Sequence, residues 1–171
     1  MSTAERPAPE PTAEPTAEPV VLRTEDPASP SGRRLREAYW ADVAAACGLD
    51  AGSGVPAGDE DSLAAPRGTF LVAAARGGDV GCVGVRLLDP GTAEVKRLYV
   101  APAARGLRLG VRLLEAAEEW ARARGAQRVV LDTRRELVAA LALYARAGYA
   151  EVEPYNDNPD AQVWLAKPLT S

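Results

Sequence analysis

The stretch Arg105-Gly-Leu-Arg-Leu-Gly110 joins an apolar run to a long amphipathic segment and places positive charge where a helix is expected to begin. No acidic residue occurs from Pro102 through Leu114. Because a helix N-terminus already carries a partial charge of roughly +0.5, its first turn usually contains acidic residues. Arg105, Arg108 and Arg112, together with unpaired backbone N–H groups, instead indicate a site for an anion such as phosphate. Three solvated arginines on an exposed face are the alternative.

Apolar runs and turn residues on both sides of this stretch predict the fold. The expected strands are residues 20–24, 69–75, 80–88, 93–100, 127–132, 149–152 and 162–169. The expected helices are residues 31–48, with Ser31 as N-cap, 109–125 and 136–147. A Glu118–Arg122 pair is expected on the surface of the second helix. The pattern predicts an α+β domain, with a mixed, largely antiparallel central sheet flanked by helices and one parallel strand-helix-strand crossover.

The first nineteen residues differ in kind from the rest of the 171-residue chain, because they repeat Pro-Thr-Ala-Glu and contain little to bury. We expect residues 1–19 to be a disordered tail and residues 20–171 to form one domain. Most of the net charge of −4 lies in that tail. The nearly neutral remainder argues against a broad nucleic-acid surface, so no nucleic-acid partner is expected.

Several classes of protein are excluded by what the sequence lacks. It contains no histidine, and Cys47 and Cys82 are its two cysteines, so we expect no metal site and no Ser-His-Asp or Cys-His catalysis. No signal peptide and no apolar run long enough to cross a membrane is recognisable, which predicts a cytoplasmic protein without a membrane partner. Glutamate, aspartate, tyrosine, lysine or water remain as groups that could move protons.

The glycine spacing in the stretch fits neither the dinucleotide fingerprint nor a P-loop. It resembles the Gln/Arg-x-x-Gly-x-Gly/Ala signature of the GNAT superfamily of N-acetyltransferases. Four further segments resemble the core of that family in order and spacing: Val95-Lys-Arg-Leu-Tyr-Val100, Ala101-Pro-Ala-Ala-Arg105, Leu113-Leu114 and Leu143-Tyr-Ala-Arg-Ala-Gly-Tyr149. The resemblance covers about residues 20–169 and implies acetyl-CoA as co-substrate.

The resemblance also implies which residues bind acetyl-CoA. Backbone N–H groups of the turn hold the pyrophosphate, and the bulged strand before it binds the pantetheine arm. Arg108 stands where the family usually has glycine, so its side chain either swings outward and adds a guanidinium or occludes the turn. Leu137 replaces a frequent asparagine. The residues concerned are Leu98, Tyr99, Val100, Arg105, Gly106, Leu107, Arg108, Leu109, Gly110 and Val111.

For direct acetyl transfer, the resemblance assigns Tyr144 as the proton donor to the CoA thiolate and Glu94 as the general base. A tyrosine with a pKa of about 10 is protonated at neutral pH and can donate to such a thiolate. Tyr144 could also be a core aromatic residue, and Glu94 could form a surface ion pair with Lys96. Asp132 is the other candidate base, or else a cap for the helix that begins near Glu136.

The acceptor is expected to be a primary amine of a small molecule or an amino acid, with a protein N-terminus or a lysine side chain as the alternative. By resemblance, Tyr155 and Asn156 in the polar turn at residues 155–158 would bind it, although the same residues simply favour a turn. We expect a monomer or homodimer. The alternative function is a non-catalytic acyl-CoA-binding sensor or interaction module with the same fold.

Overall fold

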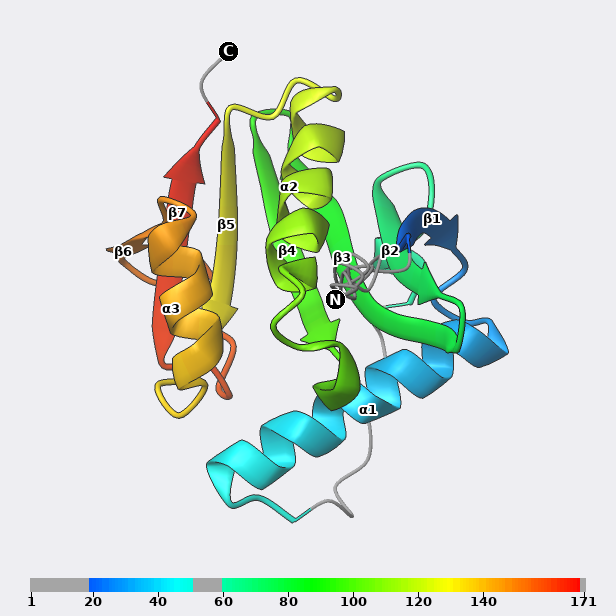
Figure 1. The fold of residues 1–171 in the computed structure, drawn as a ribbon. Coiled ribbons are helices and arrows are strands. Elements are labelled where there is room, and N and C mark those ends of the chain that lie inside the picture. Colours follow the sequence, from blue (N-terminus) through cyan, green and yellow to red (C-terminus); the bar gives the residue numbers. More distant parts are fainter. Residues whose placement is uncertain (1–18, 51–59, 170–171) are drawn as a thin grey trace, which may run out of the picture.

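The computed structural model describes residues 19–50 and 60–169, which form a seven-stranded sheet with three α-helices (Figure 1). The strands are β1 Val21–Glu25, β2 Gly68–Ala75, β3 Gly78–Asp89, β4 Thr92–Val100, β5 Arg128–Thr133, β6 Ala150–Val152 and β7 Val163–Pro168. The helices are α1 Pro30–Cys47, α2 Leu109–Arg122 and α3 Val138–Arg146, with short 3-10 helices at Asp61–Leu63 and Pro102–Ala104. Residues 1–18 of the tail predicted to be disordered lie outside the described residues.

The strand order of the sheet is β1-β2-β3-β4-β5-β7-β6. Within the described chain, β4 and β5 pair in parallel and every other neighbouring pair is antiparallel. The parallel pair is connected through α2, which is the crossover predicted from the sequence. The predicted fold class, a largely antiparallel mixed sheet flanked by helices, is therefore confirmed.

The two faces of the sheet are covered by different helices. One face packs under α2 and α3, where Leu113, Leu114 and Ala117 meet strand residues such as Val85 and Val129. Figure 1 shows α2 lying along β4, and α3 beside it over β5 and β7. The other face packs against α1 and the 3-10 helix Asp61–Leu63, through a second cluster of Leu35, Leu63, Phe70, Val72 and Cys82. No helix in the described part of the chain is long and apolar enough to cross a membrane.

The N-cap of α1 lies two residues before the predicted one. Ser29 is the N-cap, and its Oγ accepts a hydrogen bond of 3.0 Å from the backbone N–H of Gly32. Pro30 follows at the first helical position, where its missing N–H costs nothing and its fixed φ suits the helix. The prediction of Ser31 as cap was therefore wrong. Gly48 ends the helix at φ 62, as expected for a left-handed cap.

The predicted surface pair between Glu118 and Arg122 is also wrong. Glu118 is 5% exposed and points into the core rather than along the helix surface. Its carboxylate accepts a hydrogen bond of 3.0 Å from the Tyr149 hydroxyl and pairs with Lys167 Nζ at 2.7 Å. A buried carboxylate requires such partners, and here they tie α2 to the end of the sheet.

Candidate active site

The parallel strands β4 and β5 pair over only part of their length. Thr92, Ala93 and Glu94 of β4 face Arg128, Val129 and Val130 of β5, and the pairing ends there. Figure 1 shows the two strands side by side at one end and apart at the other. From Val95 onward, β4 has no strand partner on this side among the described residues. The open end is where β4 runs toward the turn that begins α2.

A bulge interrupts β4 at this open end. The register with β3 shifts between the pairs Gly84–Lys96 and Cys82–Tyr99, so two residues of β4 lie opposite one residue of β3. Arg97 has φ 58, a left-handed backbone that is unusual for a residue other than glycine. The family resemblance predicted a bulge in this strand and assigned Leu98, Tyr99 and Val100 to the pantetheine arm, and these three residues follow Arg97 directly.

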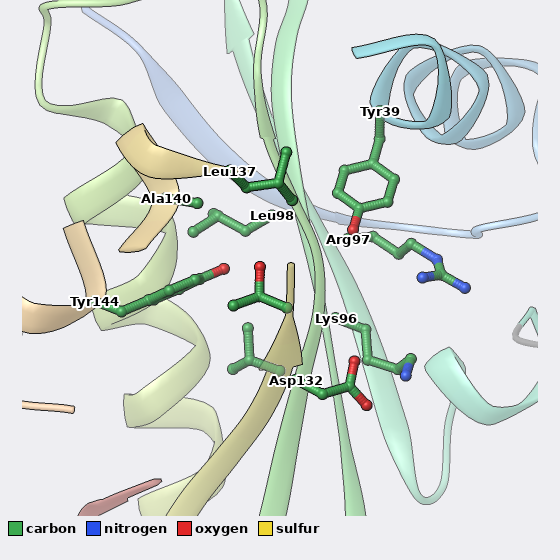
Figure 2. Close-up of a pocket in the computed structure, with 10 residues that line it drawn as sticks. Tyr39, Lys96, Arg97, Leu98, Asp132, Leu137, Ala140 and Tyr144 are labelled. Atoms are coloured by element: carbon green, nitrogen blue, oxygen red, sulfur yellow. The ribbon is translucent and has the colours of Figure 1, made fainter. Parts of the chain in front are cut away.

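A cavity lies where β4 and β5 separate, between α1 on one side and α3 on the other (Figure 2). In Figure 2 the hydroxyls of Tyr39 and Tyr144 approach this space from opposite sides. Tyr144 is 7% exposed. Burial raises the pKa of the Tyr144 phenol, and the neighbouring Tyr39 and Asp132 raise it further. The lining residues are Tyr39, Val95, Lys96, Arg97, Leu98, Asp132, Thr133, Leu137, Ala140 and Tyr144.

Glu94 lies behind this cavity rather than in its wall. It is 1% exposed, and its carboxylate pairs with Arg86 at 2.6 Å and with Lys96 at 3.6 Å. The Tyr155 hydroxyl donates to it at 2.9 Å. A pair with Lys96 therefore exists, but the expectation that it lies at the surface is wrong, because Arg86 and Tyr155 enclose the carboxylate. Burial and Glu94 raise the pKa of Tyr155, which keeps its hydroxyl a donor.

Asp132 lies at the end of β5 and lines the cavity. Its two oxygens accept hydrogen bonds from the side-chain amides of Asn156, at 2.6 Å, and Asn158, at 3.2 Å. Asn156 in turn accepts a bond of 2.8 Å from the Trp164 indole. The alternative role of Asp132 as a helix cap is wrong, because α3 has Leu137 at its N-cap and no side-chain cap bond. In the polar turn, Tyr155 thus donates a hydrogen bond to Glu94, and Asn156 donates one to Asp132. These two carboxylates are the candidate bases.

The turn before α2 is built from backbone groups. Gly106 has φ 85 and Arg108 has φ 58, so two left-handed residues lie close together just before the helix. Arg108 is the N-cap of α2, and its carbonyl accepts from the Arg112 N–H at 3.1 Å. Among the described residues, the N–H groups from residue 106 to residue 111 have no backbone acceptor. Such a run of free N–H groups at a helix N-terminus suits an anion.

The three arginines of this region have different surroundings. Arg105 donates to the Val100 carbonyl at 3.0 Å and pairs with Asp42 of α1. Arg112 donates to the Val20 carbonyl at 2.8 Å. The exposed side chain of Arg108 forms no hydrogen bond or ion pair with the rest of the described chain. Two of the three charges are therefore already engaged by the protein.

Gly110 serves helix packing. A Cβ at this position would lie 2.9 Å from Leu143 Cδ1 of α3, which is closer than side chains normally approach. Its absence lets α2 and α3 lie together on one face of the sheet. This glycine of the signature therefore sets the distance between the helices that flank the open strands.

Tyr39, Lys96 and Arg97 line the cavity without having been assigned to the site from the sequence. Tyr39 occurs at the helical spacing of the apolar residues of α1, so it reads as a core residue. Lys96 was considered as a surface partner of Glu94. On a regular strand Arg97 would lie on the same face as Val95, and the bulge in β4 breaks that alternation. Asn158, beside Asp132, appeared only as part of a polar turn.

A mixed sheet split at its one described parallel pair, and a turn before the crossover helix whose N–H groups lack backbone acceptors among the described residues, fit a transferase that uses an acyl-CoA. The chain matches the model described as the Acetyltransferase (GNAT) family over residues 33–149, more than half of its length, and it belongs to that family. It is an acetyl-CoA-dependent N-acetyltransferase, as the resemblance predicted.

Individual relatives agree with this assignment. The chain is 40% identical over 114 residues to the IAA acetyltransferase of Azospirillum brasilense, covering 65% of this chain and 74% of that protein. A Klebsiella pneumoniae protein described as a candidate acyl-CoA N-acyltransferase has a TM-score of 0.68 at 29% identity, over 88% of this chain and 98% of its own. An aminoglycoside 6'-N-acetyltransferase complexed with coenzyme A has a TM-score of 0.62 at 16% identity, over 86% and 96%, which shows the fold alone.

Proposed function

We propose that the protein transfers the acetyl group of acetyl-CoA directly to the primary amine of a small molecule or an amino acid. The observation that carries this proposal is the cavity at the open end of β4, which is lined by one buried phenol, that of Tyr144, and one carboxylate, that of Asp132. A direct transfer needs a proton donor and a proton acceptor on opposite sides of the reacting carbonyl. We also propose a cytoplasmic protein that acts as a monomer or homodimer.

The turn at residues 105–111 would hold the pyrophosphate of acetyl-CoA. Its N–H groups from residue 106 to residue 111 lack backbone acceptors in the described chain, which fits an anionic group. Arg108 would add its guanidinium, since this side chain is exposed and forms no hydrogen bond or ion pair with the described residues. The backbone of Leu98, Tyr99 and Val100 would bind the pantetheine arm, because the adjacent side of β4 is open.

Tyr144 would donate the proton that the departing thiolate needs. In the reaction the amine nitrogen bonds to the acetyl carbon, the carbon–sulfur bond breaks, and the sulfur takes the phenol proton. The raised pKa of Tyr144 keeps the phenol protonated at neutral pH. Because the ring also packs edge-on against Tyr149, with centroids 5.8 Å apart, its position is fixed.

Asp132 is the stronger candidate for the group that accepts the amine proton, directly or through water. It lines the cavity, whereas Glu94 is enclosed by Arg86, Lys96 and Tyr155. Glu94 would then act by holding Tyr155. Tyr155 and Asn156, the predicted acceptor-binding residues, would shape the acceptor side through their bonds to these two carboxylates.

The test is release of free thiol from acetyl-CoA with a panel of primary amines and amino acids. We expect release that depends on an added amine and falls by about 100-fold or more in Tyr144→Phe. Thermal unfolding of Tyr144→Phe beside the native chain separates a loss of catalysis from a loss of folding. Binding of CoA without release in the presence of any amine would favour the sensor alternative. Absence of CoA binding would contradict both functions.

A further inference from the structure

Asp132 and Trp164 occupy facing positions on neighbouring strands. They form one of the cross-strand pairs of the antiparallel β5–β7 ladder. The two side chains of such a pair project from the same face of the sheet. Their neighbours Leu131 and Leu165 pack into the cluster under α2 and α3, so Asp132 and Trp164 project from the opposite face. The pairing therefore places an indole beside the carboxylate that lines the cavity.

The side chain of Asn156 links this indole to the carboxylate. Its Nδ2 donates a hydrogen bond of 2.6 Å to Asp132 Oδ2, and its Oδ1 accepts one of 2.8 Å from Trp164 Nε1. Because an indole N–H can only donate, it requires the oxygen end of the amide to face it. The other end, which carries the N–H groups, must then face Asp132. The backbone N–H of Asn158 supports the same orientation through a longer bond of 3.3 Å to Asn156 Oδ1.

Asn158 holds the second oxygen of Asp132 in a similar way. Its Nδ2 donates to Asp132 Oδ1 at 3.2 Å, and its own Oδ1 accepts a bond of 3.1 Å from the backbone N–H of Asp160. Both carboxylate oxygens are thus held by amides whose own oxygens face N–H donors. A carboxylate can accept about four hydrogen bonds. Two held bonds therefore orient the group and still leave acceptor positions for an amine or a water molecule.

The turn that carries the two asparagines is itself anchored to the sheet. The Tyr155 hydroxyl donates to Glu94 of β4 at 2.9 Å. At the other end of the turn, the backbone N–H of Gln162 donates to the carbonyl of Thr133 in β5 at 3.0 Å. The asparagines are thus held between two fixed points, and the orientation of Asp132 is determined by residues from β7 and from the turn before it.

We propose that Trp164 is a positioning residue, which acts through Asn156 to hold the carboxylate of Asp132 in the orientation that accepts the amine proton. The inference rests on the proposed function, in which Asp132 is the proton acceptor. A proton acceptor must lie within hydrogen-bond reach of the proton that it removes. Displacement of a reacting group by about 1 Å can lower a rate by about 100-fold. An indole that touches neither substrate is therefore expected to influence the rate.

The first test is Trp164→Phe, which keeps an aromatic ring but removes the indole N–H. Asn156 then retains only the longer bond from Asn158, so its amide can turn and direct its oxygen toward the carboxylate. With the amine of the panel that releases thiol fastest, kcat is expected to fall by about tenfold. The KM for acetyl-CoA is expected to stay unchanged. Steady-state thiol release with both substrates varied measures the two parameters.

A double-mutant cycle with Asp132→Asn distinguishes positioning from general damage. If Trp164 acts through the carboxylate, Trp164→Phe should cause no further loss of kcat in a chain that already carries Asp132→Asn. A disturbance of the fold would lower kcat in both backgrounds. Asn156→Ala removes the linking amide without altering β7 and provides a second variant if Trp164→Phe does not fold. It should show the same dependence on Asp132, and thermal unfolding of each variant verifies the fold.

Trp120→Phe is the matched control. It makes the same substitution in α2, at a ring whose centroid lies 4.0 Å from Cζ of Arg124. Because this ring belongs to a helix on the other face of the sheet from Asp132, its kcat should equal that of the native chain.

The outcomes separate the inference from the proposed function. Native kcat in both Trp164→Phe and Asn156→Ala would overturn the inference, as would a loss that persists undiminished beside Asp132→Asn or that is matched by Trp120→Phe. If Asp132→Asn itself retains native kcat, the inference fails while acetyl transfer to the amine stands. If no amine of the panel gives thiol release from the native chain, the proposed function fails and the inference fails with it.

Discussion

The turn at residues 105–111 and the cavity between β4 and β5 are built from different parts of the chain. The turn offers a run of backbone N–H groups, and its arginine side chains are either engaged elsewhere or exposed. The cavity is defined by side chains from α1, β4, β5 and α3. Any sequence that folds into the turn supplies its N–H groups, whereas the cavity depends on particular residues. The turn thus suits a common co-substrate, and the cavity suits a selected acceptor.

Arg97 in the cavity and Arg108 in the turn illustrate this difference. Both have φ 58, and they are the two residues other than glycine with positive φ in the described chain. Arg97 is seated over the rings of Trp40 and Tyr39. Arg108 is exposed at the start of α2. The left-handed backbone therefore orients a side chain at Arg97, and it shapes the turn before α2 at Arg108.

The largest effect is expected from Asp132→Asn in the cavity. The variant retains the shape of the side chain but loses the charge that accepts a proton, so kcat/KM for the amine should fall by about 100-fold or more. The KM for acetyl-CoA should stay unchanged, because Asp132 belongs to β5 and is not part of the turn before α2. Steady-state kinetics with both substrates varied measure the two parameters. Asp157→Asn, in the exposed part of the neighbouring turn, is the matched control, and an equal loss there would contradict the assignment.

Gly110→Val is expected to disturb the turn at residues 105–111 indirectly, by changing how α2 packs against α3. The first added carbon would lie 2.9 Å from Leu143 Cδ1, so α2 or α3 must shift. Overpacking of this kind costs about 1–3 kcal/mol of folding stability. Denaturant unfolding measures the loss, and CoA binding should weaken with it because α2 carries the last N–H groups of the turn. Full stability together with native CoA affinity would show that the two helices separate freely.

A smaller effect of mixed sign is expected from Arg108→Gly. Glycine relieves the left-handed strain, which should stabilise the fold by about 1 kcal/mol. Loss of an exposed guanidinium should raise the Kd for CoA only a few-fold, since exposed charge contacts contribute about 0.2–1 kcal/mol. Thermal unfolding and calorimetric titration with CoA give both values. Tighter CoA binding in the variant would indicate that the arginine occludes the turn.

The last prediction concerns alkaline pH, where we expect the activity to change least. The protonated phenol of Tyr144 is the proposed donor, and burial raises its pKa above the ordinary value of about 10. Its protonated fraction is therefore complete at neutral pH and declines only above that raised pKa. We expect kcat to show no fall between about pH 7 and pH 10. A fall in this range that disappears in Tyr144→Phe would contradict the assignment.

Much of the fold could be predicted because local patterns and tertiary structure agree. The hairpin turns, the amphipathic period of α2 and the strand that follows it are visible in the sequence, and together they specify the β4-α2-β5 crossover. The cap of α1 was misplaced because Ser29 and Ser31 both suit a cap, and only the position of Pro30 in the folded helix separates them.

The site was harder to predict than the fold because its geometry depends on register and burial. The burial of Glu94 follows from Tyr155, sixty-one residues away, which no local pattern connects to it. Glu118 looked like a surface residue of α2 until Tyr149 and Lys167 were placed beside it. The orientation of Arg97 depends on one left-handed residue in β4, and strand periodicity alone predicts the opposite face.

Because the β4–β5 pairing ends early, part of β4 has an unpaired edge in the middle of the sheet, as an outer strand has. Exposed strand edges normally attract other polypeptides and promote aggregation. Here the unpaired length of β4 lies beside a cavity with Tyr39 of α1 and Tyr144 of α3 in its walls, which shields it from neighbouring proteins. A narrow chain with its own amide groups, such as a pantetheine arm, can add to that length as a strand would. In the proposed function, the co-substrate would itself occupy the place of the missing strand partner of β4.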